Sequence, residues 1–122
     1  MANIFDAGDI KAQIIREADN PHIRKKILPG ALKMDRDDII EKGNHLFEMT
    51  KMNGWLWVEA QVVKDVVDFS LGNNSLLTQD EIKGEVKIMQ RVKALISMRD
   101  EFISDAKKKT EAEKEEKTEE GG

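Results

Sequence analysis

Apolar side chains recur at helical spacing in the stretch that follows Thr78. These positions are Ile82, Val86, Met89, Val92, Leu95, Ile96, Phe102 and Ile103. Steps of three and four residues place them along one side of a helix. Thr78 and Glu81 have the spacing of a capping box, in which each side chain binds the backbone amide of the other residue. The pattern therefore predicts a long helix over residues 79–108.

The segment before this helix is apolar on two adjacent stripes. One stripe holds Leu56, Ala60, Val63, Val67 and Leu71, and the other holds Trp55, Val58, Val62, Val66 and Phe69. The remaining face is expected to carry Glu59, Lys64, Asp65 and Asp68. A strand would place Trp55 and Trp57 on one side with Glu59, so alternation fails and we expect a helix over 55–71. A short turn that begins at Gly72 should fold this helix back, antiparallel, onto 79–108.

Three further helices are expected upstream. Residues 35–52 carry Ile39, Ile40, Leu46 and Phe47, and Gly43 in this helix would permit a close crossing with a neighbour. Asn53-Gly54 is a break signal, and whether 36–71 forms one bent helix or two stays open. Two short basic helices are expected within 9–28, separated by the Asn20 cap and Pro21.

These elements predict an all-α protein: a small helical bundle built on a long antiparallel helical hairpin. Residues 1–106 would form its single domain. From Lys107 to Gly122 the only apolar side chain is Ala112, so 107–122 is expected to be a flexible Lys/Glu-rich tail. Whether the Gly121-Gly122 end is native stays open.

Composition narrows the chemistry. The absence of cysteine excludes disulfides, thiolate metal sites and a cysteine nucleophile. The sequence contains no phosphate-binding glycine loop, no Gly-x-Ser-x-Gly elbow and no His-Glu-x-x-His pair. Glu41, His45 and Glu48 share a helix face, but a solvated face explains this set better than a metal site. We therefore expect no catalytic residue, no metal, no cofactor and no small-molecule substrate: the chain is not predicted to be an enzyme.

Two other absences bear on location. The sequence has no apolar run of about 18 residues, which a membrane-spanning helix needs. Its first residues lack the basic and apolar regions of a signal peptide. A cytoplasmic protein without membrane contact is the expectation.

Two candidate surfaces remain. Trp55 and Trp57 lie about 200° apart around a helix, so at least one should be exposed or lie in an interface, where tryptophan is enriched. The hypothetical interface comprises Trp55, Trp57, Val58, Val62, Val66 and Phe69. The second surface is a basic N-terminal region with Lys11, Arg16, Arg24, Lys25, Lys26, Lys33 and Arg36.

The first surface predicts a helical assembly protein, an adaptor or scaffold that self-associates or docks on a protein partner through apolar helix faces. A homo-oligomer is expected. The second surface supports an alternative, a nucleic-acid-binding regulatory or DNA-packaging-type subunit that contacts phosphates. A subunit or inhibitor of a partner enzyme is a third interpretation.

Overall fold

The computed structural model describes residues 7–30, 33–72 and 77–120. In these residues the chain forms five α-helices and no strand, which confirms the all-α class. The helices are α1 (Ala7–Asp19), α2 (Pro21–Ile27), α3 (Arg36–Met49), α4 (Asn53–Ser70) and α5 (Gln79–Glu120). None of the helices in the described ranges has a stretch long and apolar enough to cross a membrane.

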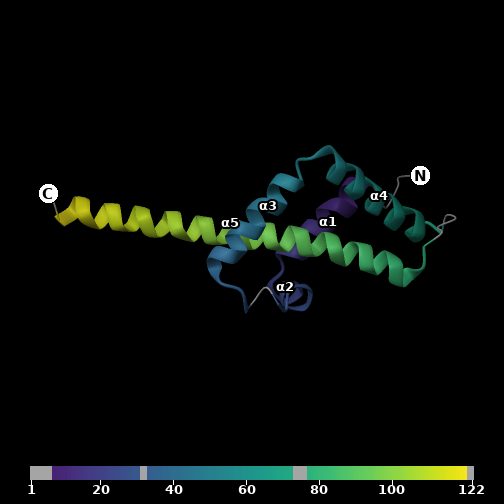
Figure 1. Cartoon of the computed structure of the whole chain (residues 1–122), viewed down its shortest axis with the longest axis horizontal. Helices are drawn as coiled ribbons and strands as arrows, with labels where there is room; N and C mark the ends of the chain where they lie inside the picture. Colours follow the sequence, from purple (N-terminus) through teal and green to yellow (C-terminus); the bar gives the residue numbers. More distant parts are fainter. Residues whose placement is uncertain (1–6, 31–32, 73–76, 121–122) are drawn as a thin grey trace.

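Helix α5 is the axis on which the others are arranged. Its first half lies beside α1, α3 and α4, with α2 on the opposite side from α4, and its second half projects away toward the C-terminus (Figure 1). Helix α5 packs most extensively against α3 and α1, and less against α4. The predicted two-helix hairpin of α4 and α5 is therefore not confirmed as the centre of the fold, because α1 packs against both of its helices.

The helix ends follow the local sequence signals. The Thr78 amide donates to Glu81 Oε1 at 3.4 Å, and the Glu81 amide donates to Thr78 Oγ1 at 3.2 Å, which confirms the capping box. The His22 amide donates to Asn20 Oδ1 at 2.9 Å, and Pro21 opens α2 as expected. Gly72 has a φ of 70°, the left-handed conformation that suits glycine after a helix end.

The sequence left open whether residues 36–71 form one bent helix or two, and the structure shows a break between α3 and α4. Residues 36–70 form two helices, and the interruption lies at Thr50, Lys51 and Met52, just before the Asn53-Gly54 signal. The Thr50 hydroxyl donates to the Phe47 carbonyl at 2.7 Å and thereby satisfies one of the last acceptors of α3.

The core consists of two clusters along α5. One contains Ala18, Ile27, Leu28, Ile39, Ala94 and Met98. The other contains Ile10, Ile14, Val62, Val63 and Met89. The first cluster joins α1, α2 and α3 to α5, whereas the second joins α1 and α4 to α5. Helix α1 contributes to both, so the short N-terminal helix links the two halves of the core.

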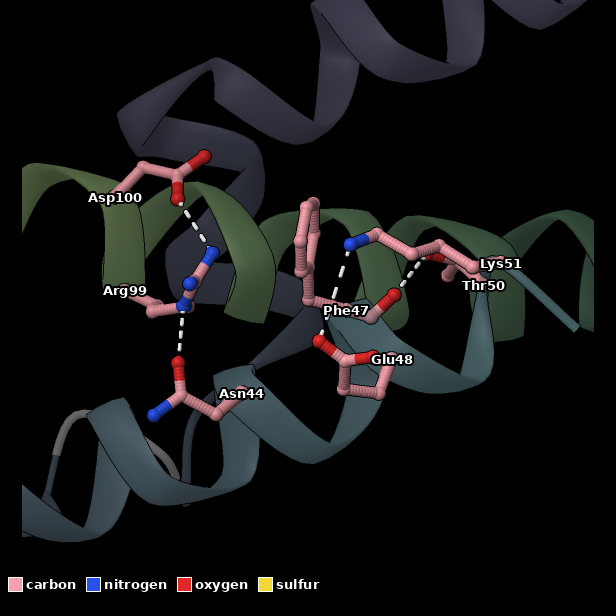
Figure 2. Close-up of polar contacts among 7 residues, drawn as sticks. All are labelled: Asn44, Phe47, Glu48, Thr50, Lys51, Arg99 and Asp100. Atoms are coloured by element: carbon pink, nitrogen blue, oxygen red, sulfur yellow. Dashed lines mark hydrogen bonds and ion pairs between the residues drawn. The ribbon is translucent and has the colours of Figure 1, made fainter.

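Helices α3 and α5 cross at Gly43. A Cβ atom at this position would lie 2.5 Å from Arg99 Cβ, so the close approach that the sequence suggested is confirmed. The Arg99 side chain then turns along α3, where its Nε donates to Asn44 Oδ1. Figure 2 shows the Phe47 ring between the Arg99 guanidinium and the Lys51 ammonium, which lie 4.6 and 4.2 Å from its centroid.

The C-terminal segment differs from its prediction. Helix α5 continues from residue 108 to Glu120, so a flexible tail over 107–122 is not confirmed. Lysine and glutamate are good helix formers, and a helix that is already nucleated adds such residues at little cost. Gly121 and Gly122 lie outside the described residues.

Candidate interaction surface

Helix α4 buries the seam between its two apolar stripes. Val62, Val63 and Glu59 are its buried residues, and all three point toward α1 and α5. Val62 belongs to one predicted stripe and Val63 to the other, so each stripe is covered only along its inner edge. The outer edges of both stripes face solvent.

Glu59 was expected on the polar face of α4, and this prediction is wrong. The residue is only 5% exposed. On a helix wheel Glu59 falls between the two apolar stripes, so any packing that buries the seam also buries its carboxylate. A buried carboxylate is tolerated only where cations or hydrogen-bond donors replace the lost water.

Three groups supply that replacement. Lys11 Nζ of α1 lies 2.7 Å from Glu59 Oε1, and Lys93 Nζ of α5 lies 3.4 Å from Glu59 Oε2. Trp55 Nε1 donates to Glu59 Oε2 at 3.0 Å. Burial raises the pKa of Glu59, but the two ammonium groups outweigh this effect and hold the pKa below its ordinary value. The carboxylate therefore ties α1, α4 and α5 together at one point.

A second acidic contact lies between α4 and α5. Burial raises the pKa of Glu85 above its ordinary value, and the carboxylates of Asp65 and Glu81 raise it further. Glu85 Oε2 is buried and has no hydrogen-bond partner. The contact between Glu85 of α5 and Asp65 of α4 therefore opposes the packing of these two helices when both of these carboxyl groups are ionised.

Large apolar side chains are exposed mainly on α4. Eight such side chains are exposed in the described part of the chain, and six of them belong to α4 or to the residues that cap it. These six lie on both flanks and on the solvent side of the helix, and together we call them the α4 face: Met52, Leu56, Trp57, Val58, Phe69 and Leu71. Trp57 is the most exposed of them, at 65%. Ile15 of α1 and Ile88 of α5 are the other two.

The hypothetical interface overlaps the α4 face only in part. Trp57, Val58 and Phe69 are exposed, whereas Val62 and Val66 pack in the core cluster shared with α1. Trp55 is half-buried above Glu59. The expectation that at least one tryptophan would be exposed is confirmed by Trp57.

Met52, Leu56 and Leu71 were absent from the hypothetical interface. Leu56 and Leu71 belong to the first predicted stripe, and only the second stripe had been assigned to an interface. The signal that could have identified them is the width of the apolar arc, which exceeds what one packing face covers.

Three of the basic N-terminal residues bind other helices of the same chain. Lys11 binds Glu59, and Arg24 binds Glu101 of α5 through both carboxylate oxygens, at 2.9 and 3.0 Å. Arg36 donates to the Phe102 carbonyl at 2.9 Å. These three cations hold the helices together. The four others are exposed, and none of them makes one of these contacts: Arg16, Lys25, Lys26 and Lys33. The nucleic-acid alternative therefore depends on these four residues and stays a prediction.

Among the described residues, no group of three or more His, Asp and Glu side chains could hold a metal ion. His45 is exposed on α3.

No protein-family model, curated protein or solved structure matches this chain.

Proposed function

We propose that this chain is a non-enzymatic helical interaction protein that docks on a protein partner, or on itself, through the α4 face. The observation that carries the proposal is the concentration of exposed large apolar side chains on this one helix. Single exposed apolar residues are ordinary, whereas a group of them on one element is typical of an interaction site.

The anchoring of α4 supports the proposal. The Glu59 cluster fixes this helix to α1 and α5 from its inner side, so the α4 face is held on a rigid support. Burial of apolar surface contributes roughly 25 cal/mol per Å². A partner that covers Trp57 and the leucines beside it would therefore gain affinity without the cost of ordering α4 first.

A site-specific photo-cross-linker tests the proposal without assuming a partner. The photoreactive residue replaces Trp57 in cells of the source organism, and the adducts are identified by mass spectrometry. The matched control carries the same residue at Ile88, which is 59% exposed but lies on α5. We expect protein adducts at position 57 several-fold above those at position 88. Equal or absent adducts at position 57 would contradict an interaction role for the α4 face.

A further inference from the structure

Helix α4 begins with the dipeptide Asn53-Gly54, and an Asn-Gly pair occurs once in the chain. Both residues are exposed, and a Cβ atom at Gly54 would meet nothing within 4 Å. Among the described residues the Gly54 amide has no acceptor, because the first backbone bond at this end runs from the Leu56 amide to the Met52 carbonyl at 3.1 Å. The Asn53 side chain makes no hydrogen bond to a described residue either.

The other two asparagines in the described ranges lack this freedom. Asn20 precedes Pro21, whose nitrogen carries no hydrogen, and its side chain caps α2. Asn44 lies inside α3, where Arg99 Nε donates to its Oδ1 and the next backbone amide is bonded within the helix. Asn53 is therefore the described asparagine whose side chain and following amide are both free to react.

We propose that Asn53 is a self-modification site, whose slow conversion to a carboxylate places a negative charge on the α4 face. The Gly54 amide nitrogen gives its proton to solvent and attacks Asn53 Cγ, and the side-chain nitrogen leaves as ammonia. The product is a cyclic succinimide. Water then opens the ring at either carbonyl carbon, which leaves an aspartate or an isoaspartate whose main chain runs through the former side chain. The net reaction consumes one water and releases one ammonia.

The position at the start of the helix permits this reaction. The attack requires rotation of the peptide plane between Asn53 and Gly54, which breaks only the helical hydrogen bond that the Asn53 carbonyl accepts. Helix ends fray, so this opening is far more frequent here than in a helix interior. Met52, the N-cap residue, makes no side-chain capping bond that would hold the first turn closed. Glycine also leaves the attacking nitrogen unhindered.

The new charge would lie beside the exposed apolar side chains of α4. Position 53 is three residues before Leu56 and four before Trp57, so these two side chains are its neighbours on the helix surface. The first turn of α4, which is described in full, contains no acidic residue. A carboxylate that an apolar partner covers loses its water, which is unfavourable without a cation to pair with it. Modification should therefore weaken docking at the α4 face, a consequence that rests on the proposed function.

Peptide mapping of the purified, folded chain tests the modification. After weeks in mildly alkaline buffer made with heavy-oxygen water, we expect aspartate and isoaspartate at position 53, both carrying the heavy oxygen, and an unchanged Asn44. Gly54→Ala should react several-fold more slowly, because its methyl group hinders the attacking nitrogen and its higher helix propensity reduces fraying. Circular dichroism checks that both chains stay helical. If Asn53 reacts no faster than Asn44 in the folded chain, the proposal is overturned.

Cross-linking from position 57 tests the consequence for docking. Asn53→Asp should give several-fold fewer protein adducts than Asn53→Gln, which keeps a neutral amide at the same place. Equal adduct yields from the two variants would overturn the effect on docking. Normal adducts together with an unmodified Asn53 would leave the proposed function intact and the modification wrong. Absent adducts from the wild-type chain would contradict the proposed function, whereas the mapping result is measured on the isolated chain and does not depend on it.

Discussion

Helices α3 and α4 pack against the same helix, but different forces position them. At the α3–α5 crossing, Gly43 lets the backbone of α3 approach Arg99 so closely that a Cβ atom would not fit. At the other site, α4 is fixed by the Glu59 carboxylate between Lys11 and Lys93. Shape complementarity determines the α3–α5 crossing, whereas charge determines much of the contact of α4 with α1 and α5.

This difference explains why α4 is left with an exposed apolar surface. The carboxylate lies at the centre of the seam that α4 buries, so the apolar residues on both sides of it are covered only along their inner edges. Helix α3, in contrast, buries Ile39 and Gly43 directly against its neighbours. Helix α4 is anchored by a charge at the centre of its apolar arc, and its apolar flanks stay exposed.

The largest expected effect is the loss of the Glu59 carboxylate. Glu59→Ala leaves Lys11 and Lys93 without their shared partner and creates a small cavity. Removal of one member of a buried ion pair costs about 3–5 kcal/mol, and the half-exposed Lys11 can turn to water, so we expect about 2–3 kcal/mol here. Urea unfolding measures the free energy of unfolding.

Glu48→Ala is the matched control for this change. Glu48 pairs with Lys51 at 3.8 Å, and both side chains are more than half exposed. Exposed pairs contribute little, so the control should change the free energy of unfolding by less than about 0.5 kcal/mol. If the two variants are equally stable, charge does not anchor α4 and the comparison with α3 fails.

Gly43→Ala tests the crossing that depends on shape. The new methyl group would overlap Arg99, and overpacking of this kind costs about 1–3 kcal/mol. Gly84→Ala is the control, since a Cβ atom at this position of α5 meets nothing within 4 Å. This control should gain about 0.5–1 kcal/mol from helix propensity alone. Opposite signs in thermal or urea unfolding are the expected result, and a stabilised Gly43→Ala variant would show that the crossing has room.

The smallest effect is a dependence of stability on pH at the α4 contacts. The pKa of Glu59 is lower in the folded chain, so its contribution is present at neutral pH and is lost as pH falls below the ordinary value of 4.5 toward the lowered pKa. The pKa of Glu85 is raised, so its contribution is present below pH 4.5 and is lost as pH rises through the raised pKa.

Amide variants separate these two contributions. At pH 7 we expect Glu59→Gln to lower the free energy of unfolding and Glu85→Gln to raise it, because the amide removes the repulsion from Asp65 and Glu81. Both differences should shrink as the pH falls, the Glu85 difference first because its pKa is raised and the Glu59 difference last because its pKa is lowered. Urea unfolding between pH 3 and pH 7 provides the measurement. A Glu85→Gln variant that is less stable than wild type at pH 7 would contradict the assigned repulsion.

The sequence by itself determined the local features of this protein. The Thr78 capping box, the Asn20 cap, the left-handed Gly72 and the apolar spacing of α5 each depend on residues within about four positions of one another. Backbone hydrogen bonds and caps act over this range, so their patterns can be recognised along the chain. The close approach at Gly43 could also be suggested, because the absence of a side chain is visible in the sequence.

Only the tertiary structure decided which side of α4 is buried. The two apolar stripes of α4 are compatible with several packing faces. Which face is buried depends on α1, because its Lys11 contacts Glu59 only in the assembled helices. The same assembly uses Arg24 and Arg36 as internal contacts and leaves Trp57 exposed. Burial depends on which elements meet in space, and the free-energy differences among alternative packings of amphipathic helices are not encoded in the spacing of any one of them.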